Sequence, residues 1–199
     1  MDRVKKDMTA VAALERDAEL MLRVRDGDDA SFTILLEKHR GPVIHFLYRM
    51  VQNQAVAEEL GQEAFLRVYR SRGSYEPTAK FTTWLFRIAN HLALNWIRDR
   101  KNERGQESLD EVAADGQVRQ VADREPTTEQ QLIRQAHQAE VRRAIQSLPE
   151  KQRSALVRHK YEEMEYSQIA GVLECSESAV KSLLFRAYET LRSRLAHMA

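Results

Sequence analysis

Two amphipathic helical segments, each bordered by basic residues, lie on either side of an acidic stretch that has no helical pattern. The first covers residues 81–101, where apolar side chains recur every three or four positions, as on the buried face of a helix. That face consists of Leu85, Ile88, Ala89, Leu92 and Trp96. The other positions carry rings, amides and cations, which are the side chains that bind unstacked bases and phosphates. The pattern favours two helical modules on a tether, both facing nucleic acid.

The chain is predicted to be all-α. Strand-like alternation of β-branched residues is scarce, and the 199 residues include only four prolines and seven glycines. The expected helices span residues 17–25, 30–51, 55–71, 82–101, 129–147, 150–161, 167–173 and 178–196. We expect two small helical domains.

The acidic stretch between the domains is predicted to be a flexible linker. Residues 104–134 carry seven acidic and four basic side chains, with few large aliphatic ones. Such a tether can lie in a basic channel of a partner, or it can be a solvated spacer, which the composition favours. The expected organisation is a tail (1–16), a helical domain (17–103), the linker (104–130) and a second helical domain (131–197).

The second domain ends in the pattern of a helix-turn-helix. A short helix at residues 167–173 is followed by the turn Glu174-Cys175-Ser176 and a longer basic helix. Ser176 is placed to cap that helix, although Glu174 stands where such turns often carry glycine. The outer face holds Glu177, Ser178, Lys181, Ser182, Phe185 and Arg186. These types read bases and hold phosphates, whereas the alternative is a helical hairpin with a solvated basic face.

Composition narrows the functional classes. The formal net charge is only +1, so nucleic-acid binding must rest on local clusters of charge. The single cysteine, Cys175, excludes a disulfide framework and a cysteine-based zinc site, which fits a reducing, cytoplasmic location. No apolar run is long enough for a membrane helix. The chain also lacks a phosphate-binding glycine loop and a His-Glu-x-x-His motif. We therefore expect no cofactor, no bound metal and no enzymatic activity.

Three motifs in order resemble a known family. They are the run from Glu58 to Phe65, the segment Thr83-Trp84-Leu85-Phe86-Arg87-Ile88-Ala89, and the segment from Val180 to Ala187. Together they resemble the extracytoplasmic-function (ECF) sigma factors of the sigma-70 family. The resemblance covers about residues 17–104 and 140–195.

The resemblance implies a non-enzymatic initiation factor that binds core RNA polymerase, directs it to specific promoters and helps melt the minus-10 element. The expected contacts with the β′ clamp helices of the polymerase are Glu58, Glu59, Gln62, Glu63 and Phe65. The expected contacts with the minus-10 strand are Tyr75, Lys80, Phe81, Trp84, Arg87, Asn90 and His91. The expected contacts with the minus-35 element are Ser176, Ser178, Lys181, Ser182, Phe185 and Arg186. The β flap and an anti-sigma factor are further expected partners.

Two other classes are compatible with the residues. A conventional regulator would bind duplex DNA through the helix-turn-helix alone and would use the first domain for dimerisation or sensing. An interaction module would use its helical faces mainly for a protein partner. Binding to core polymerase distinguishes the initiation factor from the conventional regulator.

Overall fold

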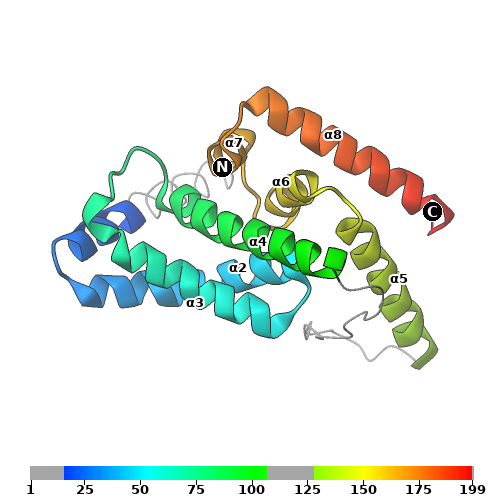
Figure 1. The fold of residues 1–199 in the computed structure, drawn as a ribbon, viewed down its shortest axis with the longest axis horizontal. Helices are drawn as coiled ribbons and strands as arrows, with labels where there is room; N and C mark the ends of the chain where they lie inside the picture. The colour runs from blue at the N-terminus through cyan, green and yellow to red at the C-terminus, as the bar shows by residue number, and fades with distance from the viewer. Residues whose placement is uncertain (1–15, 107–127, 199) are drawn as a thin grey trace, which may run out of the picture. The chain divides into compact units, whose positions relative to one another are not determined.

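The computed structural model describes residues 16–106 and 128–198 (Figure 1). Within these ranges every regular element is helical. A helix at residues 16–25 precedes α2 (Asp29–Val51), α3 (Gln54–Arg70), the 3-10 turn η1 (Arg72–Ser74), α4 (Phe81–Gln106), α5 (Thr128–Gln146), α6 (Glu150–Tyr161), α7 (Tyr166–Leu173), α8 (Glu177–Arg194) and the 3-10 turn η2 (Ala196–Met198). The all-α prediction is confirmed. No helix in the described ranges is both long and apolar enough to cross a membrane.

The predicted helices are all present, with ends shifted by a few residues. The largest shift is in α4, which continues past Lys101 to Gln106 and therefore enters the region expected to be linker. The predicted tail, apart from its last residue, lies outside the described residues. So do residues 107–127 of the linker predicted at 104–130.

The described helices fall into two compact units. The N-terminal unit contains the helix at residues 16–25 with α2, α3 and α4, and the C-terminal unit contains α5, α6, most of α7 and α8. In the N-terminal unit α2, α3 and α4 lie side by side (Figure 1). Gly61 allows α3 to approach α2 closely, because a Cβ atom there would lie 3.0 Å from Cγ1 of Ile44. The core of this unit includes Leu35, Phe46, Met50, Ala64, Val68, Leu85 and Phe86.

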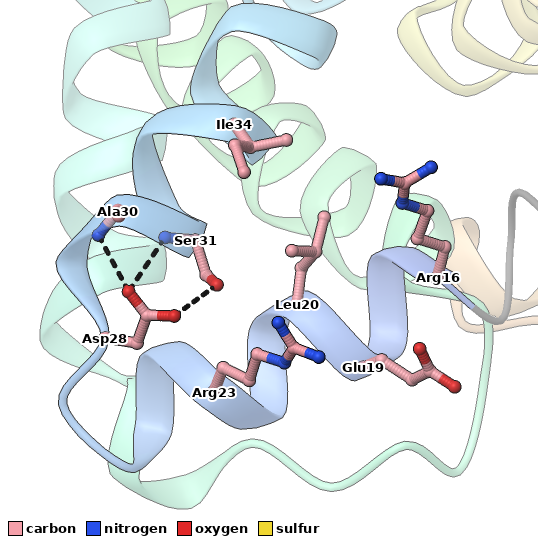
Figure 2. A pocket seen from close by; sticks show the side chains of 8 residues that line it. All are labelled: Arg16, Glu19, Leu20, Arg23, Asp28, Ala30, Ser31 and Ile34. Carbon is pink, nitrogen blue, oxygen red and sulfur yellow. Dashed lines mark hydrogen bonds between the residues drawn. The ribbon is translucent and has the colours of Figure 1, made fainter.

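The turn that leads into α2 is fixed by Gly27 and Asp28. Gly27 has a φ of 101°, a conformation that a side chain would strain. Oδ1 of Asp28 accepts hydrogen bonds from the backbone amides of Ala30 and Ser31, and Oδ2 accepts one from the Ser31 hydroxyl (Figure 2). A hollow of about 240 Å³ beside this cap is smaller than the pockets of about 300–1,000 Å³ that bind small molecules.

The C-terminal unit is built on the contact between α6 and α8. Its apolar core includes Leu148, Leu156, Val157, Ile169, Val180, Leu184 and Ala187. Arg158 of α6 is fully buried in the same unit and donates hydrogen bonds to the carbonyl and the hydroxyl of Ser154. Burial lowers the pKa of Arg158 to about 9, although the nearby charge of Glu162 acts in the opposite direction.

Candidate nucleic-acid and protein interfaces

One face of α3 is a row of exposed charged and amide side chains. Ala57, Gly61 and Ala64 are buried on the other face, which leaves Glu58, Glu59 and Gln62 exposed and Glu63 half-buried. Nε of Arg67 donates a hydrogen bond of 2.7 Å to Glu63, and this bond holds the pKa of the Glu63 carboxyl below its usual value. The four polar residues predicted for the protein interface therefore share one surface.

Phe65 does not belong to that surface. Its side chain is only 5% exposed and packs in the core of the N-terminal unit, as the helical spacing along α3 indicates. The exposed apolar residue of this face is its neighbour Leu66, which is 48% exposed. The sequence contained the signal for Leu66, since it lies four residues after Gln62 and seven after Glu59, on the same side of a helix.

The loop between η1 and α4 is anchored by a cluster of aromatic rings. The ring of Tyr75 lies 5.0 Å from that of Trp84 and 6.3 Å from that of Phe81, and the rings of Phe81 and Trp84 are 6.1 Å apart. Tyr75 is 2% exposed and Phe81 is fully buried. Both rings therefore lie in the interior of the unit, Phe81 against His39 of α2 and Tyr75 against Phe81 and Trp84.

The remaining predicted strand contacts lie along α4 and at its start. Lys80 and His91 are exposed, and Trp84 and Arg87 are half-buried. Asn90 is only 2% exposed and lies in the interior of the unit. The predicted strand-binding residues with accessible side chains are therefore Lys80, Trp84, Arg87 and His91. Further along the helix, Trp96 is half-buried.

Beside this cluster, the helix at residues 16–25 is attached to α2 by a buried hydrogen bond between Asp17 and His39. Oδ2 of Asp17 lies 2.9 Å from Nε2 of His39, and Oδ1 accepts a hydrogen bond of 2.6 Å from Nζ of Lys38. Burial alone would raise the pKa of Asp17, but the hydrogen bonds and positive charges of His39 and Lys38 outweigh it and lower the pKa. This pair was not predicted, because its residues are distant in the sequence.

The turn between α7 and α8 follows the predicted pattern. The hydroxyl of Ser176 accepts a hydrogen bond of 3.2 Å from the amide of Ala179, which confirms the predicted cap. Glu174 has a φ of 52°, the left-handed conformation for which glycine is usual at a helix end. The turn is closed by a hydrogen bond of 3.1 Å from the amide of Cys175 to the carbonyl of Ala170.

The outer face of α8 is polar, basic and partly aromatic. Val180, Leu184 and Ala187 are buried, so the opposite side of the helix is left to solvent. The exposed residues include all six that the sequence placed at the minus-35 element: Ser176, Ser178, Lys181, Ser182, Phe185 and Arg186. Phe185 is 67% exposed, and the neighbouring Tyr188 is 41% exposed. Such a surface suits a helix that contacts base edges and phosphates in a major groove.

Comparisons with known proteins agree with this organisation. The sequence matches Sigma-70 region 2 over residues 35–103 and Sigma-70, region 4 over residues 138–191. It is 31% identical to the RNA polymerase sigma-H factor of Pseudomonas aeruginosa, with 91% of this chain and 94% of that protein covered. It is 29% identical to the ECF RNA polymerase sigma-E factor of Escherichia coli, with 90% of this chain and 94% of that protein covered.

Two solved structures share the fold. One is CnrH in complex with the cytosolic domain of CnrY, with a TM-score of 0.67, 19% identity, and coverage of 92% of this chain and 99% of that chain. The other is the sigma factor RpoE of Bartonella quintana in complex with the anti-sigma factor NepR, with a TM-score of 0.65, 19% identity, and coverage of 83% and 96%.

The chain belongs to the ECF sigma factors of the sigma-70 family. It is a promoter-specific transcription initiation factor, and the resemblance drawn from the three sequence motifs is confirmed. The family membership favours this class over a conventional operator-binding regulator.

Proposed function

We propose that the two units divide promoter recognition between them, with the C-terminal unit reading the minus-35 element through α8. The observation that carries this proposal is the outer face of α8, where Lys181, Phe185 and Arg186 are exposed beside small hydroxyl side chains. Lysine and arginine bind guanine edges and phosphates, and an exposed apolar ring can contact the methyl group of thymine. Ser176 and Ser178 at the helix start can hold a phosphate.

The N-terminal unit binds the β′ clamp helices of core polymerase through α3. Its acidic and amide face provides charge complementarity, and Leu66 provides the apolar contact that was expected from Phe65. Apolar anchors surrounded by polar residues often account for much of the energy of such interfaces. The C-terminal unit contacts the β flap.

The N-terminal unit also captures the non-template strand of the minus-10 element, beside the loop at residues 76–80. Opening a duplex costs about 1–2 kcal/mol per base-pair step, which a factor without ATP hydrolysis offsets by binding the separated strand. Lys80, Trp84, Arg87 and His91 supply the cations and rings for this binding. Tyr75 and Phe81 act from beneath the surface by supporting Trp84.

The factor acts without catalysis of its own, in the cytoplasm, and an anti-sigma factor controls its access to polymerase. The fold it shares with the sigma factor RpoE, solved in complex with the anti-sigma factor NepR, and with CnrH, solved in complex with the cytosolic domain of CnrY, supports the last point.

The decisive experiment is co-elution of the purified protein with bacterial core RNA polymerase, followed by transcription from a pool of promoter-containing fragments. Stoichiometric co-elution and new, discrete transcripts are expected. Glu63→Arg should weaken co-elution because it reverses charge on the docking face, whereas the double variant Lys181→Ala, Arg186→Ala should co-elute normally and lose the transcripts. Full transcription by the double variant would remove α8 from promoter recognition.

A further inference from the structure

The buried, hydrogen-bonded pair of Asp17 and His39 joins the helix at residues 16–25 to α2, next to the aromatic cluster that borders the loop at residues 76–80. Asp17 and His39 have side chains that are 2% and 8% exposed, whereas Lys38, the second partner of Asp17, is 43% exposed. Water can replace the exposed partner, but it has no access to the bond between Asp17 and His39. Loss of one member of a buried, hydrogen-bonded pair leaves the other unsatisfied.

His39 connects this pair to the aromatic cluster. Its ring lies 5.5 Å from the ring of Phe81, on the side of α2 that faces the start of α4. Phe81 in turn contacts Tyr75 and Trp84. A continuous chain of contacts therefore runs from Asp17 through His39 and Phe81 to Tyr75, which precedes residues 76–80, and to Trp84 in the first turn of α4.

Tyr75 is held in this cluster by its ring and not by its hydroxyl. Among the described residues, none forms a hydrogen bond with the buried hydroxyl oxygen of Tyr75. Burial raises the pKa of this hydroxyl, and the negative charge of Asp17 raises it further. An unpaired buried hydroxyl is unfavourable, so the position of Tyr75 depends on the rings around it. Phe81 packs against His39 as well as against Tyr75 and Trp84.

We propose that Asp17 and His39 are positioning residues for promoter opening. Their buried bond fixes the His39 ring against Phe81 and thereby sets the geometry of Tyr75 and Trp84 beside the loop at residues 76–80. The proposal rests on the proposed capture of the minus-10 strand by this loop and α4. It assigns to a helix that precedes the matched region 2 segment a role in strand binding, without direct contact with DNA.

The test measures binding of a fluorescein-labelled single strand by the reconstituted holoenzyme. The strand carries the non-template minus-10 sequence of a promoter obtained from the transcription experiment. Asp17→Ala is expected to weaken strand binding about tenfold, and Asp17→Asn only about threefold, because the amide oxygen can still accept a hydrogen bond from His39. Permanganate reactivity of the duplex promoter should fall in the same order. Affinity for core polymerase should stay within about twofold, because the α3 face is unchanged.

The matched control is Glu19→Ala, which removes an exposed carboxylate from the same helix and is expected to bind the strand as the native protein does. A parallel loss of strand binding, polymerase binding and thermal stability in Asp17→Asn would overturn the proposal, since the pair would then be purely structural. Native strand binding by Asp17→Ala, alongside a clear loss in Trp84→Ala, would overturn the positioning role alone. Native binding by Trp84→Ala would instead overturn the proposed minus-10 surface.

Discussion

Phe81 and Phe185 stand in similar sequence surroundings, on helices and beside a basic residue, yet one is fully buried and the other is 67% exposed. Phe81 is the first residue of α4, and its ring packs against the rings of His39, Tyr75 and Trp84. Phe185 lies on the side of α8 opposite Val180 and Leu184. In the C-terminal unit a rigid helix presents a ring before any partner is bound, whereas in the N-terminal unit the corresponding rings form a packed base below the surface.

This difference fits the two proposed tasks. A helix that reads duplex DNA must fit a groove whose shape exists beforehand, so its contact residues can be exposed on a rigid element. A strand-binding surface must compete with base pairing, and an accurately positioned ring such as Trp84 loses less freedom on binding. The following measurements compare side chains of the two units.

The largest expected difference is in stability. Phe81→Ala should lower the free energy of unfolding by about 4 kcal/mol, because it empties a fully buried site. Phe185→Ala should change it by less than about 0.5 kcal/mol, because its ring is mostly in solvent. Urea unfolding followed by circular dichroism and by tryptophan fluorescence measures both, since Trp84 and Trp96 lie in the N-terminal unit. Similar losses in the two variants would contradict the contrast in burial.

Arg158→Ala should destabilise the C-terminal unit by about 3 kcal/mol, because it removes a fully buried side chain that is hydrogen-bonded to Ser154 and faces the charge of Glu162. The loss should appear in circular dichroism, while the tryptophan transition of the N-terminal unit stays in place. Arg143→Ala, at an exposed position of α5, is the matched control. A shift of the tryptophan transition in Arg158→Ala would show that the two units unfold together.

Phe185→Ala should weaken holoenzyme binding to a promoter with its native minus-35 element about tenfold, the scale of one lost base contact. Binding to core polymerase should not change. The measurement is promoter binding in competition with a fragment whose minus-35 element is scrambled. Unchanged discrimination between the two fragments would mean that the exposed ring serves a protein partner instead of DNA.

The sequence predicted the elements that depend on local periodicity. It located the helices, the Ser176 cap and the exposed positions of Lys181 and Arg186, because all of these follow from spacing along one helix. It failed where neighbours in space decide burial. Tyr75 lies in a loop without periodicity, and only its contacts with Phe81 and Trp84 place it in the interior.

Low pH should affect the N-terminal unit through Asp17. Because its pKa is lowered in the folded protein, Asp17 contributes stability above the ordinary carboxyl value of 3.8, and this contribution is lost as the pH falls through the lower folded-state value. Asp17→Asn should therefore be less stable than the native protein near neutral pH, and the gap should narrow below about pH 4. Tryptophan-detected urea unfolding across this range measures the gap. A gap that does not change with pH would show that the carboxylate charge contributes nothing.

The smallest expected effect compares two left-handed residues at helix ends. Gln52 in the N-terminal unit has a φ of 54° and Glu174 in the C-terminal region one of 52°. The side-chain amide of Gln52 donates hydrogen bonds to the backbone carbonyls of Tyr48 and Arg49. The carboxylate of Glu174 has no N–H group to donate in the same way. Glycine would remove the backbone strain of the left-handed conformation at both sites, although it loses more conformational entropy on folding.

Glu174→Gly should therefore gain about 0.5 kcal/mol in the free energy of unfolding, whereas Gln52→Gly should gain nothing, because it also loses those hydrogen bonds. Urea midpoints from circular dichroism for Glu174→Gly and from tryptophan fluorescence for Gln52→Gly measure the two effects. Equal gains at the two sites would show that the side-chain bonds of Gln52 do not offset backbone strain. A loss in Glu174→Gly would show that the Glu174 side chain stabilises the turn despite its conformation.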